Sequence, residues 1–281
     1  MAACIPALGR APVMPARHTL TLPGWEIRIA APDRIAAVLA PLLTPLSAAE
    51  PLPPLEVTVA EDRLATGAVD DRVLWSVTLP ETGWLPLLLG QVTATGAALL
   101  RRLLFIHAGA VTIDGRAWIV VGKSGAGKTS TVAVLVRQGA AYLTDEITLL
   151  DPEAATALPF PLPMAVKPWT AQAVGTLPRG AEVAREGGVR FYLPAARAAG
   201  AAPVEGFVLL RPDGGGLAPL SRAELLMVLG EQQHSSLRYA HRLEDAFAGF
   251  SHLLRVARCY VLAAPSPAAA AELIVAAARC T

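Results

Sequence analysis

The sequence has few cysteines and almost no net charge. Its three cysteines (Cys4, Cys259 and Cys280) are scattered and form no CxxC pair. This pattern supports neither a disulfide framework nor a cysteine zinc site, and it favours a reducing, cytoplasmic location. The 24 Lys and Arg residues nearly balance the 23 Asp and Glu residues, which leaves a formal charge of +1. We therefore expect no nucleic-acid partner bound through a general basic field.

An uninterrupted hydrophobic run is also missing, although 53% of the residues are hydrophobic. The longest uncharged stretch, residues 82–100, contains Pro86, Gln91 and several glycines and threonines. A membrane-spanning helix needs about 20 mostly apolar residues in succession. We therefore expect no membrane partner, and we assign the abundant Ala, Leu and Val residues to a buried core.

Local patterns divide the chain into three parts. Residues 1–18 are predicted to be a disordered leader, because their positive charges come too late for a signal peptide. Residues 19–84 are expected to form a small α+β domain, with strands at 19–30, 55–60 and 73–79 and a helix at 33–43. Residues 85–281 are expected to form a second domain that begins with a helix over 85–104.

The second domain alternates strands and helices, which predicts an α/β fold with a mixed sheet and flanking helices. An Asp114-Gly115 hairpin joins strands at 107–113 and 117–121, and Gly139 ends a helix over 128–138. A strand over 142–150 follows, and then a Pro-rich segment that is too irregular for an ordinary connection. Further strands are expected at 203–211 and 259–263, and further helices at 221–229, 243–256 and 268–279.

Residues 122–129 match the phosphate-binding motif G-x-x-x-x-G-K-[ST]. They follow an apolar strand and open a helix, which is the context that the motif requires. The glycines let successive N–H groups point at a phosphate, and the helix N-terminus adds a partial positive charge. We expect Lys128 to reach the β- and γ-phosphates and Thr129 to contact Mg²⁺. The predicted ligand is ATP or another nucleoside triphosphate, contacted by Gly122, Lys123, Ser124, Gly125, Ala126, Gly127, Lys128, Thr129 and Ser130.

An acidic pair, Asp145 and Glu146, lies on the predicted strand that follows this helix. Successive strand residues point to opposite faces, so at most one carboxylate is expected to face the γ-phosphate. We predict Asp145 as a base, and Asp145 or Glu146 as a Mg²⁺ ligand. His107, Lys167 and Arg190 are further candidates. For each of these three, an ordinary structural or surface role is the alternative.

Residues 106–150 together resemble the catalytic core of the HPr kinase/phosphorylase family. The shared features are His107 before a short hairpin, the 122–129 loop, the helix end at Arg137-Gln138-Gly139, and the Asp145-Glu146 pair at the family's spacing. The resemblance implies a P-loop kinase core of the HPr kinase C-terminal type, preceded by the small α+β layer. It also implies that Asp145 takes a proton from the acceptor hydroxyl, that Lys128 stabilises the transferring phosphoryl group and that His107 lies beside the acidic pair.

The chain departs from that family at three points. The second Asp of the pair is Glu146, the family's Glu and R-G-x-G-I signature is missing after the core, and the N-terminal region differs. It looks more like the stand-alone HPr kinase-like proteins of gene clusters for ribosomal peptides, lasso peptides among them. The resemblance thus implies an ATP- and Mg²⁺-dependent Ser/Thr kinase acting on a peptide or protein, with a precursor peptide as the expected partner. A bifunctional HPr kinase/phosphorylase, a non-catalytic nucleotide-binding regulator and a small-molecule kinase stay open, as does the oligomeric state.

Overall fold

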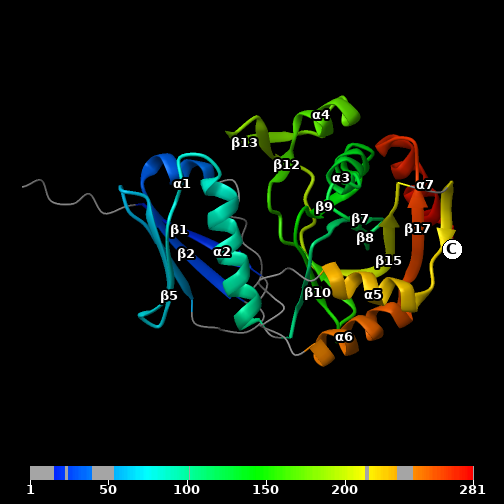
Figure 1. Ribbon diagram of the computed structural model, residues 1–281, viewed down its shortest axis with the longest axis horizontal. Helices are drawn as coiled ribbons and strands as arrows, with labels where there is room; N and C mark the ends of the chain where they lie inside the picture. Colours follow the sequence, from blue (N-terminus) through cyan, green and yellow to red (C-terminus); the bar gives the residue numbers. More distant parts are fainter. Residues whose placement is uncertain are drawn as a thin grey trace, which may run out of the picture.

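The computed structural model describes residues 16–22, 25–39, 54–100, 102–212, 215–232 and 243–280. Most of the predicted leader, residues 1–15, lies outside these ranges. Its last residues do not: the first strand begins at Ala16. Figure 1 shows an N-terminal unit beside a larger unit that holds the rest of the chain.

The N-terminal unit is one sheet with two helices. Its strands run in the order β1-β2-β3-β4-β5, with β2 and β3 parallel and the other neighbours antiparallel. Helix α2 packs on this sheet, and the Trp75 indole of β5 donates a 2.9 Å hydrogen bond to the Thr95 hydroxyl of α2. The elements are β1 (Ala16–Leu22), β2 (Trp25–Ala31), α1 (Asp33–Leu39), β3 (Leu55–Val59), β4 (Leu64–Val69), β5 (Arg72–Thr78) and α2 (Trp84–Leu99).

The prediction of one helix over 85–104 is wrong at its C-terminal end. Helix α2 ends at Leu99, and Leu104–Ile106 form strand β6. All three residues of β6 are buried, and they pair with strand β10. Arg102, which falls within the predicted helix, lies 3.4 Å from the Asp151 carboxylate. Burial of an apolar strand therefore outweighs continuation of the helix.

The larger unit contains the remaining elements. After β6 (Leu104–Ile106) come β7 (Gly109–Ile113), β8 (Arg116–Val121), α3 (Lys128–Arg137), β9 (Ala141–Thr144), β10 (Thr148–Asp151), β11 (Thr156–Leu158), β12 (Met164–Val166), α4 (Pro168–Val174), β13 (Gly180–Glu186), β14 (Val189–Pro194), β15 (Ala202–Leu210), β16 (Gly216–Pro219), α5 (Arg222–Gln232), α6 (Leu243–Val256), β17 (Arg258–Ala263) and α7 (Pro267–Arg279). The predicted α/β fold with a mixed sheet and flanking helices is confirmed.

The main sheet is covered by helices on both faces. Strand β8 shows this best, since Trp118 and Val120 belong to the core under α3 and α7, and Ile119 and Val121 to the core under α5 and α6. Figure 1 shows these two helix pairs on opposite sides of the strands. Burial on both faces explains why β8 is apolar from Ala117 to Val121 instead of alternating. No helix among the described residues is both long and apolar enough to span a membrane.

The main sheet consists of two groups of strands, and two short connections carry the chain from one group to the other. One group follows the order β16-β17-β15-β8-β7-β9, and β6, β10 and β11 join it where β11 pairs with the first residues of β15. The chain passes between the groups at residues 107–108, from β6 to β7, and again at residues 145–147, from β9 to β10. The Thr148 hydroxyl donates a 2.9 Å hydrogen bond to the Ala108 carbonyl, so these two connections lie side by side.

The Pro-rich segment is more ordered than the sequence suggests. It contains β12 and α4, and β12 belongs to a small sheet of order β12-β14-β13. This small sheet also contacts the N-terminal unit. The Glu186 carboxylate at the end of β13 accepts a hydrogen bond from the N–H of Gly83, the N-cap residue of α2.

Candidate functional site

The loop at residues 122–127 joins β8 to α3 and leaves the start of the helix open. Gly125 and Gly127 have φ angles of +85° and +95°, a region that costs other residues free energy. Gly127 is the N-cap, and it has no side chain to satisfy the first N–H groups of α3. Lys123, Ser124 and Gly125 are exposed at the tip of the loop, whereas Ser130 is buried in the helix. Free N–H groups at a helix start favour a bound anion.

Lys128, the first residue of α3, folds back over this loop. Its ammonium group donates to the carbonyls of Gly122 at 2.8 Å and Lys123 at 3.3 Å. The side chain is only 7% exposed, and this burial lowers the pKa of Lys128, against the opposing effects of the Glu146 and Asp145 carboxylates. The loop therefore holds a cation that already lies in the field of the acidic pair.

The prediction that Asp145 and Glu146 lie within a strand is wrong. Strand β9 ends at Thr144 and β10 begins at Thr148, so the pair lies in the connection between the two strand groups. Glu146 has a φ angle of +79°, which ends the extended backbone at this point. The Thr144 hydroxyl donates to the Ile147 carbonyl at 2.7 Å and closes the turn.

Asp145 is a buried carboxylate, and the residue is 1% exposed. Among the described residues, no group donates a hydrogen bond of normal geometry to either carboxylate oxygen, although the Thr129 hydroxyl and the Glu146 N–H lie close enough to affect its pKa. Burial and the nearby Glu146 carboxylate raise the pKa of Asp145 to about 6, while the Thr129 hydroxyl and the Lys128 ammonium act in the opposite direction. Leaving a buried polar group unpaired is costly, and such groups cluster at functional sites.

Glu146 and His107 meet at the edge of the same site. The Glu146 side chain is 57% exposed, and its Oε1 atom lies 3.5 Å from His107 Nδ1. The two residues come from the two short connections, which the Thr148–Ala108 hydrogen bond holds together. The structure thus brings Lys128, Asp145, Glu146 and His107 close together.

Gly109 is a residue of this site that the sequence analysis missed. A Cβ atom at position 109 would lie 2.6 Å from Val132 Cγ2 and 3.3 Å from Asp145 Oδ1. The backbone of β7 therefore passes so close to α3 and Asp145 that a side chain cannot fit. A glycine at the start of an apolar strand was the available signal, because it often marks a close backbone approach.

Gly109→Ala is expected to destabilise the protein by about 1–3 kcal/mol, because the new methyl group overpacks against Val132. It is also expected to impair whatever reaction Asp145 serves, since the methyl group lies against that carboxylate. Urea unfolding measures the first effect. Gly200→Ala is the control, because a Cβ atom there meets nothing within 4 Å. Equal stability of the two variants would contradict the close approach.

Of the two additional cations, Arg190 lies on β14, and Lys167 is the N-cap residue of α4. Arg190 is opposite Val166, and Lys167 directly follows that residue. The Arg190 guanidinium is bound to the Glu182 carboxylate at 2.7 Å, and Glu182 also binds Arg185 at 2.8 Å. Lys167 lies near Lys128, whose pKa it helps to lower, and its Nζ atom is 5.3 Å from the centre of the Trp169 ring. Of this pair, only Lys167 therefore lacks a carboxylate partner in the described part of the chain.

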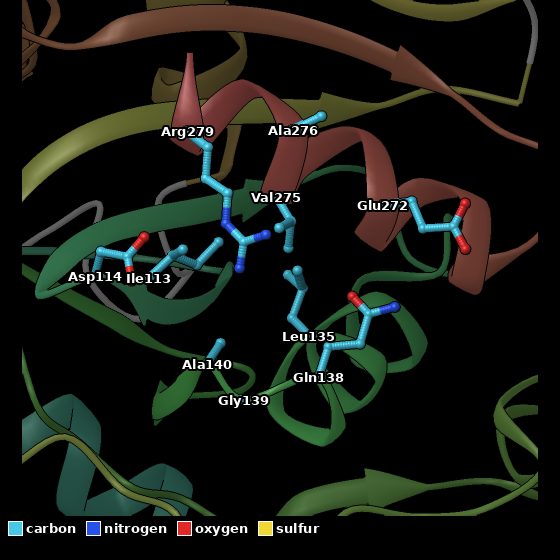
Figure 2. A pocket seen from close by; sticks show the side chains of 10 residues that line it. All are labelled: Ile113, Asp114, Leu135, Gln138, Gly139, Ala140, Glu272, Val275, Ala276 and Arg279. Atoms are coloured by element: carbon cyan, nitrogen blue, oxygen red, sulfur yellow. The ribbon is translucent and has the colours of Figure 1, made fainter. Parts of the chain in front are cut away.

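A separate pocket of about 450 Å³ lies at the other end of α3. Figure 2 shows Arg279 and Val275 of α7 facing Leu135 of α3 and its C-cap residue Gln138 across this pocket, with Asp114 at its side. None of the predicted site residues lines it. The glycine-rich loop and this pocket therefore lie at opposite ends of α3.

The residues around Asp145 suit a magnesium ion that substrate phosphates help to bind, rather than a metal ion bound by protein side chains alone. Among the described residues, no group of three or more His, Cys, Asp and Glu side chains could hold a metal ion. Mg²⁺ is usually bound by one or two carboxylates together with substrate phosphates and water. Asp145, with both oxygens unpaired beside the Thr129 hydroxyl, provides such a partial ligand set.

Comparison with known proteins adds no assignment. Neither a protein-family model nor a curated protein matches this chain.

Proposed function

We propose that this protein is an ATP- and Mg²⁺-dependent kinase that phosphorylates a Ser or Thr hydroxyl of a peptide or protein. The observation that carries the proposal is the buried, unpaired Asp145 carboxylate beside Lys128 and Thr129, next to the open start of α3. A phosphate-binding loop alone would serve binding. A base with a pKa of about 6 adds the group that phosphoryl transfer to a hydroxyl requires.

The proposed reaction uses these residues in distinct roles. The acceptor hydroxyl oxygen forms a bond to the γ-phosphorus, the bond from that phosphorus to the bridging oxygen breaks, and ADP leaves. Asp145 accepts the proton of the hydroxyl. Lys128 exchanges its carbonyl partners for phosphate oxygens and offsets the charge on the transferring group, together with the N–H groups of residues 122–129.

Thr129 and Asp145 would hold Mg²⁺, with Glu146 as an outer carboxylate. When bound, the ion neutralises phosphate charge and aligns the transferring group with the acceptor. His107 contacts Glu146 at 3.5 Å and limits where this carboxylate can point. The proposal therefore gives His107 a role in positioning.

A precursor peptide of a ribosomal natural product, of the lasso type, is the acceptor to test first. The support is the resemblance of residues 106–150 to the HPr kinase/phosphorylase core, together with the missing second signature of the bifunctional enzymes.

The test is incubation of the full-length protein with γ-labelled ATP, Mg²⁺ and peptides that contain Ser or Thr, each paired with an Ala-substituted control. We expect label on the hydroxyl peptides alone and none with Asp145→Asn. Release of pyrophosphate from phospho-HPr and inorganic phosphate would favour the bifunctional alternative. Nucleotide binding without label on any acceptor, unchanged in Asp145→Asn, would contradict the kinase and favour a regulatory protein.

A further inference from the structure

We propose that Trp169 is the platform on which the base of the nucleotide stacks, with Lys167 contacting its phosphates. This inference rests on the proposed function and extends it to nucleotide recognition. It assigns a specificity role to a residue pair outside the glycine-rich loop.

The first supporting observation is the position of α4 relative to α3. Both β12 and α4 pack on α3. At one end, the Arg137 guanidinium of α3 donates to the carbonyls of Val174 at 2.8 Å and Thr176 at 2.9 Å, so the ends of the two helices coincide. At the other end of α4, Lys167 is the N-cap residue, and its charge acts on Lys128. Helix α4 therefore packs on α3 with Lys167 and Trp169 at the end away from Arg137.

The second supporting observation is the high exposure of Trp169. Its side chain is 63% exposed, whereas Trp118 is fully buried and Trp75 is partly buried against Thr95. Lys167 lies 5.3 Å from the ring centre, and the high exposure leaves much of the indole surface open. An exposed indole offers a large, rigid apolar surface to a planar partner at a low cost in conformational entropy.

The charge of Lys167 indicates which kind of ligand would bind beside the Trp169 ring. Arg190 is held by Glu182, but Lys167 has no carboxylate partner among the described residues. A cation and an open indole beside a phosphate-binding loop complement a molecule that combines phosphates with a flat ring, which is the chemistry of a nucleotide. An apolar side chain of the acceptor peptide would use the ring but would leave Lys167 unpaired.

The test compares MgATP with magnesium tripolyphosphate, which has the phosphates but no base. Binding of each is measured by calorimetry on the full-length protein. Trp169→Ala is expected to weaken ATP binding by about 5- to 100-fold, the range of aromatic–base stacking, and to leave tripolyphosphate unchanged. Trp169→Phe should restore most of the affinity. Lys167→Ala should weaken both ligands. Met227→Ala, at an equally exposed apolar residue of α5, is the matched control and should weaken neither.

The outcomes separate this inference from the proposed function. Equal weakening of both ligands by Trp169→Ala would mean that Trp169 supports the loop, and would overturn the stacking role. Unchanged ATP affinity, with a raised KM for a peptide acceptor, would assign the ring to the acceptor and also overturn it. If the wild-type protein bound neither ligand, the proposed function itself would fail.

Discussion

Asp145→Asn is expected to remove phosphoryl transfer and, at the same time, to make the protein more stable at neutral pH. Loss of a positioned base lowers the rate by about 100- to 10,000-fold. The amide keeps the shape of the side chain but cannot accept the proton. Transfer is measured with labelled ATP and acceptor peptide, and stability by urea unfolding at pH 7.5.

The direction of the stability change follows from the pKa of Asp145. It rises from 3.8 in the unfolded chain to about 6 in the folded protein, mainly through burial. The folded state therefore loses stability as the pH rises from about 4 to about 6, because the buried carboxyl must ionise. The full cost, at most about 3 kcal/mol, is present above pH 6 and is absent in the neutral amide.

The same pKa predicts a pH profile of stability. Without Mg²⁺, the stability advantage of Asp145→Asn should shrink as the pH falls from about 6 to about 4. Asp151→Asn is the matched control. Asp151 is also nearly buried, but its carboxylate accepts hydrogen bonds from Glu153 N and Ala154 N. That variant should lose stability and keep transfer. A less stable Asp145→Asn protein at pH 7.5 would contradict the assigned burial cost.

Lys128→Ala is expected to lower transfer by about 100- to 1,000-fold, the usual effect of removing one charged or hydrogen-bonding group at the transition state. The loop should keep its shape, since Gly125 and Gly127 determine its backbone. Arginine should not rescue the activity, because a planar guanidinium cannot replace the compact ammonium group of a residue that is only 7% exposed.

A coupled effect distinguishes this role from loop support. Lys128 lowers the pKa of Asp145, so its removal should raise that pKa and shift the residual activity toward higher pH. The pH–rate profile of the variant measures the shift. Arg116→Ala, at the other end of β8 and 62% exposed at its side chain, is the control and should change neither rate nor profile. An unshifted profile in Lys128→Ala would show that the two groups do not interact.

Much of the site was predictable because its signals are local. The apolar run of β8, the glycines at 125 and 127 and the helix from Lys128 follow from short-range backbone preferences, which adjacent residues determine. The Asp114-Gly115 hairpin was predictable for the same reason, since both residues have the left-handed φ angles that such a turn needs. The kinase assignment rests on these local motifs and stays a prediction.

Other features of the site depend on contacts between distant segments, which only the tertiary structure determines. The acidic pair was expected within one strand, but β9 and β10 belong to different strand groups, and the passage between them turns Asp145 inward and Glu146 outward. Lys167 and Arg190 looked equivalent in the sequence, and only the partner at Glu182 separates them. The sequence by itself determined the loop and the identity of the charged residues. Long-range strand pairing decided which of them is buried, and burial raises the pKa of Asp145 toward the range of a useful base.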